Sequence, residues 1–310
     1  MQYPQTPHGR AILACALGDT LGLPYEFTGR VFDLETSALS QTSDITWSDD
    51  TQQSLVLLDE YLRFGNLDPH RFMTRLVAYR DYPAEARFGL HRGTGRGFRH
   101  SVAYYADFKT FGAMQGRDGN GAAMRVASVA FAMPADERSI EQINAITSST
   151  HDMPNSFHAA EAVVRTVWAL RDGTPKGEEL ALVSSQLPKG QARQILEQLS
   201  NTTDWKETIT ADNPEWGPGQ GFSLRSPLSA IYIALHSTSI EDAIRQSIAI
   251  GDDTDSTASI AAAIATAMHP LEDVAHELFD FRGRDALLDW DSETGPPDPM
   301  HLIDLEIQLR

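Results

Sequence analysis

The sequence predicts an all-α fold, and three observations support this prediction. Apolar residues recur at helical spacing along much of the chain, as at Leu55, Leu58 and Leu62. Almost no segment before residue 290 alternates polar and apolar residues with the period of two that is typical of a strand. The stretch 258–267 is so rich in alanine that neighbours must pack closely around it, so we expect a central helix there.

The composition indicates a globular chain whose length of 310 residues permits one large domain or two ordinary ones. No repeat, low-complexity tract or convincing linker divides the sequence, so we expect a single domain over residues 1–310. Its 25 Lys and Arg against 43 Asp and Glu give a formal net charge of −18, which argues against nucleic acid or an anionic membrane as partner. The single cysteine, Cys15, excludes an internal disulfide framework, fits a reducing compartment and is interpreted as a buried small residue. The apolar run 11–17 is too short to span a bilayer, and we expect a cytoplasmic protein.

The first predicted helix runs over residues 9–21 and places an acid at its unfavourable end. Asp19 falls in the last turn, where the helix dipole favours a cation, so we expect Asp19 to have a specific partner. Glu26 follows the helix between two aromatic residues, which could keep its carboxylate partly dry and raise its pKa, as acid–base work requires. An ordinary solvated loop glutamate is the alternative.

Two acidic clusters, Trp47–Thr51 and Gly251–Thr257, each precede a helical apolar stripe and are interpreted as helix N-termini. Capping needs only one or two such residues, whereas 252–257 holds three aspartates and three hydroxyl residues. Crowded carboxylates repel one another unless a cation lies between them. Oxygen ligands without cysteine suit Mg²⁺, Mn²⁺ or Ca²⁺, so the clusters predict a metal site, with plain capping as the alternative.

Further helix starts are expected at Asp68-Pro69 and Pro154, and capping boxes at Ser139 and Ser239. The Gly/Arg loop 88–97 could bind phosphate or be an ordinary turn with solvated arginines.

The segment Gly119-Asn120-Gly121 is a candidate anion site. Its glycines allow the backbone to approach a ligand, and a helix expected over 123–133 would direct its N-terminus to the same place. The segment lacks the features of a P-loop and of a dinucleotide fingerprint. His151, just before an expected helix over 156–171, could donate to a phosphate or ribose, or simply bond to backbone.

Two later segments allow more than one interpretation. Phe222 lies in a glycine-rich loop and could stack on a base or cover the core. The tail 295–310 contains a strand-like alternation after a proline-rich segment, and it could dock as an extended segment on the core or on another subunit.

The chain resembles the ADP-ribosylglycohydrolase family in an ordered set of motifs over about residues 9–270. Each motif is weak alone, but their order is specific. The matching pieces are Gly18–Gly22 with Glu26, Ser48–Thr51, Gly119–Gly121 with Met124-Arg125, Thr150-His151 and Asp253–Ser256.

The resemblance implies a single compact orthogonal helical domain with a binuclear metal centre, two Mg²⁺ or Mn²⁺, at the base of an ADP-ribose cleft. It implies Glu26 as a mobile acid–base residue, with Asp49 and Asp253 also essential for catalysis. The implied substrate-binding residues are Gly119, Asn120, Gly121, His151 and Phe222. The implied metal ligands are Ser48, Asp49, Asp50, Asp253, Asp255 and Ser256.

The sequence departs from the family pattern in three places. Ser48 and Ser256 stand where threonine is common, and serine keeps the ligand oxygen. Asp252 replaces a glycine and adds a charge that could alter metal affinity or contact a cationic leaving group.

The implied function is hydrolysis that releases ADP-ribose from a modified protein, with arginine N-linkage as the first expectation. Serine-linked and free ADP-ribose derivatives are the alternatives within the family. Two other classes stay open, which are an ADP-ribose-binding scaffold without turnover and a phosphohydrolase of a nucleotide diphosphate. The expected partners are an ADP-ribosylated protein and ADP-ribose, with no nucleic acid and no membrane.

Overall fold

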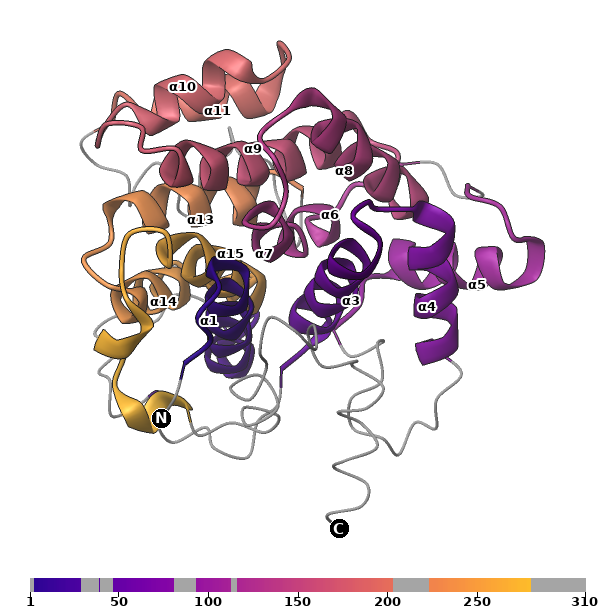
Figure 1. The fold of residues 1–310 in the computed structure, drawn as a ribbon, viewed down its shortest axis with the longest axis horizontal. Helices are drawn as coiled ribbons and strands as arrows, with labels where there is room; N and C mark the ends of the chain where they lie inside the picture. Colours follow the sequence, from indigo (N-terminus) through magenta and orange to yellow (C-terminus); the bar gives the residue numbers. More distant parts are fainter. Residues whose placement is uncertain are drawn as a thin grey trace.

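The computed structural model describes residues 3–28, 39, 47–80, 93–112, 116–202 and 223–279, and the regular elements in these ranges are all helices. The predicted all-α class is therefore confirmed for the described chain (Figure 1). The helices are α1 (Pro7–Gly22), η1 (Leu23–Tyr25), α3 (Asp49–Phe64), α4 (Pro69–Arg80), α5 (Arg96–Phe108), α6 (Gly121–Met124), α7 (Ala127–Ala130), α8 (Glu137–Thr150), α9 (Pro154–Arg171), α10 (Glu179–Gln186), α11 (Gln191–Leu199), α13 (Arg225–His236), α14 (Ile240–Ala249), α15 (Thr254–Ala265), η4 (Leu271–Asp273) and η5 (His276–Phe279).

Helices α1 and α15 form the central pair of the molecule (Figure 1). A Cβ on Gly18 would lie 2.3 Å from the carbonyl oxygen of Ala258, and a Cβ on Gly22 would lie 2.6 Å from that of Thr254. Only glycine permits so close an approach of two backbones. The pair is antiparallel, so the end of α1 lies beside the start of α15, whose residues are all buried as expected for the alanine-rich helix.

Helix α3 lies against both members of this pair and begins where the sequence predicts a helix N-terminus. Ser48 is its N-cap, and its Oγ accepts a 3.3 Å hydrogen bond from the Asp50 N–H. Gly65 ends the helix with φ +67°, a backbone conformation that favours glycine. The first acidic cluster therefore does form a helix N-terminus, and Cys15 is buried as expected.

Two expected helices differ from the structure. The helix expected over 123–133 is two four-residue helices, α6 and α7, because the N–H of Val126 reaches back only three residues, to Ala123 O. Helix α8 begins at Glu137, earlier than the expected start at Ser139. The Asp136 carboxylate accepts a 2.8 Å hydrogen bond from the Ser139 N–H, so aspartate provides the cap that we had assigned to serine.

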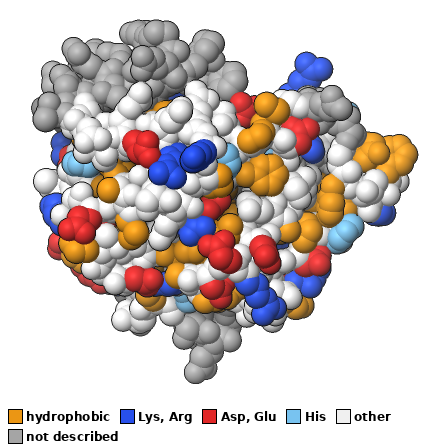
Figure 2. Space-filling view, turned by 90° about the horizontal axis from the view of Figure 1, so that it is seen from above, with side chains coloured by type: hydrophobic (Ala, Val, Ile, Leu, Met, Phe, Trp, Pro, Cys, Tyr) orange, Lys and Arg blue, Asp and Glu red, His pale blue; other side chains and the backbone are white. Residues whose placement is uncertain are grey.

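Acidic, basic and apolar side chains are interspersed over the face shown in Figure 2. Hydrophobic side chains gather at the edge of that face where α5 lies (Figure 2). Phe108 of α5 is 63% exposed, and its ring packs against Tyr104 with 4.6 Å between centroids. None of the described helices has the length and apolar character needed to cross a membrane.

Candidate active site

Three helix ends bring five carboxylates to one cavity of about 350 Å³. Glu26 comes from the turn after η1, a pair of aspartates from the start of α3, and another pair from the start of α15. The antiparallel packing of α1 on α15 and the position of α3 beside them explain why segments so distant in sequence meet here. The carboxylates that line the cavity are those of Glu26, Asp49, Asp50, Asp253 and Asp255.

Asp19 has the specific partner that its unfavourable position predicts, and that partner is the N-terminus of α3. Its carboxylate accepts hydrogen bonds from Ser48 N at 2.9 Å, Thr51 N at 3.1 Å and Thr51 Oγ1 at 2.7 Å. The positive end of the α3 dipole and these donors offset the unfavourable position of the Asp19 charge at the C-terminal end of α1. Asp19 therefore fixes the first acidic cluster against the central helix pair.

Asp50 connects α3 to α15 through side-chain hydrogen bonds. Its Oδ1 accepts a 2.9 Å hydrogen bond from Ser259 Oγ, and its Oδ2 lies 3.3 Å from both Ser48 Oγ and Ser256 Oγ. Ser48, Asp50 and Ser256 were all predicted as metal ligands, and the structure brings them together. Ser259 was missed by our sequence interpretation, although its spacing of three from Ser256 puts it on the same helix face.

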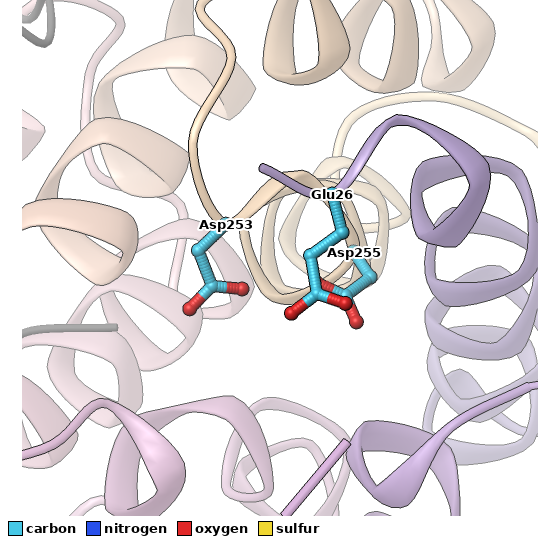
Figure 3. Close-up of side chains that lie close together, drawn as sticks. All are labelled: Glu26, Asp253 and Asp255. Atoms are coloured by element: carbon cyan, nitrogen blue, oxygen red, sulfur yellow. The ribbon is translucent and has the colours of Figure 1, made fainter. Parts of the chain in front are cut away.

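Glu26, Asp253 and Asp255 form the tightest group of acids in the cavity. One carboxylate oxygen from each lies within 4.8 Å of the others. In Figure 3 the carboxylates of Glu26 and Asp255 lie side by side and that of Asp253 faces the same open space. The group joins the predicted acid–base residue to two predicted metal ligands.

Burial and mutual repulsion raise the pKa values of these acids. The pKa of Glu26 is raised to about 7 by burial and by the charges of Asp253 and Asp19. The carboxyls of Asp49 and Asp255 have pKa values well above the usual range, first because of burial and then because of the neighbouring carboxylates. Burial and the same neighbours raise the pKa of Asp50.

This donor set fits a hard divalent cation. The predicted ligands offer carboxylate and hydroxyl oxygens, which Mg²⁺ and Mn²⁺ prefer, and they are Ser48, Asp49, Asp50, Asp253, Asp255 and Ser256. A cation among them would also remove the repulsion that raises their pKa values. Glu26, Asp253 and Asp255 therefore form a candidate metal-binding group.

The loop Gly119–Gly121 lines the same cavity as the acids. Asn120 Nδ2 donates a 2.6 Å hydrogen bond to Asp253 Oδ2, so this predicted substrate-binding residue contacts a predicted metal ligand. Ser156, at the start of α9, holds the loop through a 3.2 Å hydrogen bond to Gly119 O. Because α6 has only four residues, the loop backbone rather than a long helix dipole faces the cavity.

His151 also lines the cavity, and a buried chain of side chains connects it to Asp49. Gln53 Nε2 donates to Asp49 Oδ2 at 2.9 Å, and Arg125 Nη1 donates to Gln53 Oε1 at 3.0 Å. Arg125 Nη2 donates to Thr150 Oγ1 at 2.9 Å, and Thr150 Oγ1 lies 2.8 Å from His151 Nδ1. The sequence marks Arg125 and Thr150 only as motif residues, and it gives no signal for Gln53.

Two arginines give the cavity a positive side. Arg96 belongs to the Gly/Arg loop, and Arg117 is buried with its Nη1 donating to Ser101 Oγ at 2.9 Å. The Arg117 Nε has no hydrogen-bond partner among the described residues, but it lies 3.6 Å from Asp152 Oδ2, which pairs with its charge. Gly93 has φ +83°, and a Cβ there would lie 2.5 Å from Asp49 Oδ1, so the backbone at Gly93 passes directly over this acid.

Asp252, whose charge could alter metal affinity or contact a cationic leaving group, pairs with a cation of the protein itself. Its Oδ2 lies 3.0 Å from Nη1 of the buried Arg225, so the chain itself supplies the cation that pairs with it. Asp252 has φ +71°, which explains why glycine is favoured at this position. Its carbonyl accepts a 2.8 Å hydrogen bond from the Phe27 N–H and so holds the Glu26 turn beside α15.

Some predicted features lie outside the described residues. These are Phe222, residues 88–92 of the Gly/Arg loop, and the tail 295–310.

Comparisons with known proteins agree with this geometry. The family model described as ADP-ribosylglycohydrolase matches residues 9–289. The chain is 23% identical over 278 residues to the ADP-ribosylarginine hydrolase Tri1 of Serratia proteamaculans (strain 568), covering 87% of this chain and 73% of that protein. It is also 23% identical over 280 residues to the ADP-ribosylarginine hydrolase Tri1 of Pseudomonas putida (strain GB-1), covering 84% and 69%.

A solved structure described as an ADP-ribosylglycohydrolase-related protein complex has the same fold. The superposition has a TM-score of 0.71 and 20% sequence identity, and it covers 97% of this chain and 98% of the other.

Proposed function

Because the chain belongs to the ADP-ribosylglycohydrolase family, we propose that it is a divalent-metal-dependent enzyme that removes ADP-ribose from arginine side chains of a modified protein. Family membership and the two relatives make it a hydrolase of the glycosidase type. The observation that carries the finer proposal is that five carboxylates share one cavity with the Gly119–Gly121 loop, His151 and Arg117. Such a cavity has an acidic end for metal and ribose and a donor-rich end for diphosphate.

At the acidic end, the oxygen ligands would hold two Mg²⁺ or Mn²⁺ ions. When bound, such ions would supply positive charge that orients ribose hydroxyls and acidifies a water molecule. The residues proposed to hold them are Ser48, Asp49, Asp50, Asp253, Asp255 and Ser256. Asp19, Ser259 and Asn120 would keep these ligands in place through the hydrogen bonds described above.

Glu26 is proposed as the acid–base residue. Burial, the largest cause of its raised pKa of about 7 in the metal-free protein, favours the protonated form that a general acid needs. In the reaction, the water oxygen bonds to C1″ of the ribose and the bond from C1″ to the arginine nitrogen breaks. Glu26 gives its proton to the departing nitrogen and regains one from the water.

At the other end, the proposed contacts are to the diphosphate. Gly119 and Gly121 allow the backbone to approach it, and Arg117 and His151 supply side-chain donors. This division of the cavity favours an ADP-ribose ligand over a simple glycoside. It also leaves the C1″ linkage at the acidic end, where the ions and Glu26 would act.

The linkage is tested by giving the metal-loaded protein three substrates, which are arginine-linked, serine-linked and free ADP-ribose derivatives. We expect release of intact ADP-ribose from the arginine-linked protein. Activity on serine alone would overturn the arginine proposal, and release of phosphate or AMP would indicate a phosphohydrolase. Tight ADP-ribose binding without any hydrolysis over hours would indicate a binding protein.

A further inference from the structure

Donor and acceptor roles can be assigned to every hydrogen bond in the buried series of side chains from Asp49 to His151. Arginine can only donate, and Arg125 donates to both Gln53 Oε1 and Thr150 Oγ1. The Gln53 amide must then turn its NH₂ group to Asp49, as observed at 2.9 Å. The same reasoning applies to the other branch.

On that branch, Thr150 already accepts from Arg125, and its hydroxyl has one hydrogen to give. The acceptor within reach among the described residues is His151 Nδ1, at 2.8 Å. If Nδ1 carried the proton instead, Thr150 would accept twice and its own hydrogen would have no partner in the described chain. The satisfied arrangement puts the imidazole proton on Nε2.

The Nε2 edge of the ring faces the cavity next to the glycine loop. A Cβ on Gly121 would lie 3.5 Å from His151 Nε2, and Nε2 itself has no hydrogen-bond partner in the part of the chain that the structure describes. His151 is buried, and burial together with the charges of Arg125 and Arg117 lowers its pKa to about 3. The ring therefore stays neutral and carries a single N–H, while the nearby arginines favour an anion in front of it.

We propose that Arg125 is a positioning residue that acts through Thr150 to fix His151 as the Nε2–H tautomer, so that His151 donates to a diphosphate oxygen of the substrate beside Gly121. The tautomer follows from the hydrogen bonds alone, whereas the identity of the acceptor rests on the proposed function. These two parts can be tested separately.

The tautomer is measured by nitrogen NMR on ligand-free protein labelled at histidine, with the His151 signals assigned from their loss in His151→Gln. We expect Nε2 to have the shift of a protonated nitrogen and Nδ1 that of an unprotonated one. A proton on Nδ1 would overturn the proposal whether or not the protein is an enzyme. This measurement requires no variant at Thr150 to fold.

Two variants then test the route through Thr150. Thr150→Val removes the hydroxyl at nearly constant volume, and Thr150→Ser keeps it as the matched control. We expect Val to produce a mixture of tautomers and ADP-ribose binding about three- to tenfold weaker, as for the loss of one hydrogen bond, and Ser to behave as wild type. An unchanged tautomer in Thr150→Val would overturn the role of Thr150.

The acceptor is tested by titrating wild-type protein with ADP-ribose and with adenosine. ADP-ribose should move the Nε2–H signal, and adenosine, which lacks the diphosphate, should leave it in place. A shift caused by adenosine alone would overturn the diphosphate assignment while leaving the tautomer result intact.

Discussion

Thr51 Oγ1 donates a 2.7 Å hydrogen bond to Asp19 Oδ2, and through it an acid at the C-terminal end of α1 caps the N-terminus of α3. The relationship explains why an aspartate stands where the dipole of its own helix disfavours it. It also places the first two aspartates of α3 beside those of α15. The stability of the fold and the geometry of the site therefore depend on the same carboxylate.

We expect Asp19→Ala to lower the free energy of unfolding by about 2–4 kcal/mol, because buried N–H groups of α3 lose their acceptor. Asp136→Ala is the matched control, since Asp136 caps α8 through a hydrogen bond from Ser139 N, away from the cavity. Asp136→Ala should lower the free energy of unfolding by only about 1 kcal/mol. Urea unfolding of both variants checks this, and equal losses would contradict the special role of Asp19.

The raised pKa values predict how pH changes metal stabilisation. Below about pH 3, under the ordinary Asp and Glu pKa values of about 3.9 and 4.3, these acids are protonated in both the folded and the unfolded chain. As pH rises, the unfolded chain loses its protons first, so the metal-free fold loses stability until the pH passes the folded values, about 7 for Glu26. A bound cation needs the same groups deprotonated, so its stabilisation grows over this range.

We therefore expect the difference in Tm between Mg²⁺-saturated and metal-free protein to widen from about pH 5 to about pH 8. Taking the difference in Tm removes the pH dependence that both forms share. One such contribution comes from His151, whose lowered pKa makes stability rise with pH rather than fall. Asp255→Asn should reduce this difference in Tm at every pH. A difference that does not change with pH would exclude these carboxyls as the ligands.

Asn120 is expected to act on the metal site through Asp253, because its amide donates to the Asp253 carboxylate at 2.6 Å. Asn120→Ala should raise the Mg²⁺ concentration needed for half-maximal activity by about 10- to 100-fold. The control is Asn155→Ala, which removes an amide that bonds Gln191 at 3.1 Å. If the two variants needed the same Mg²⁺ concentration, Asn120 would have no such effect.

Arg117 is expected to bind the diphosphate end of the substrate. Arg117→Met should raise KM for the ADP-ribosylated substrate about tenfold or more, the usual effect of losing a charge-assisted hydrogen bond, and change kcat little. Inhibition by ADP-ribose should weaken in parallel, and weak inhibition by adenosine should not change. A loss in kcat with constant KM would mean that Arg117 supports the chemistry rather than binding.

The fold class and the two acidic clusters could be predicted from sequence because each depends on local pattern. The helix starts after Ser48 and at Pro154 follow from capping chemistry, and a partner for Asp19 is expected from its place on the dipole. The predicted cap at Ser139 is wrong because Asp136, three residues earlier, is an equally good capping residue and begins the helix first.

What could not be predicted depends on packing between distant segments. The chain from Gln53 through Arg125 to Thr150 requires α3, the turn after α6 and the end of α8 to meet, and no spacing in the sequence encodes that meeting. Asp252 shows the same limit, because its partner Arg225 lies on α13. The sequence therefore identified several acids of the site without the side chains that hold them.

The most direct test of metal-dependent hydrolysis is to incubate the purified protein with an arginine-ADP-ribosylated protein and follow the products by mass spectrometry. The reaction is run with Mg²⁺ or Mn²⁺, with a chelator, and with Asp253→Asn in the presence of metal. We predict release of intact ADP-ribose and recovery of unmodified arginine only for the wild-type protein with metal. Equal release in the presence of chelator, or by Asp253→Asn, would contradict the account.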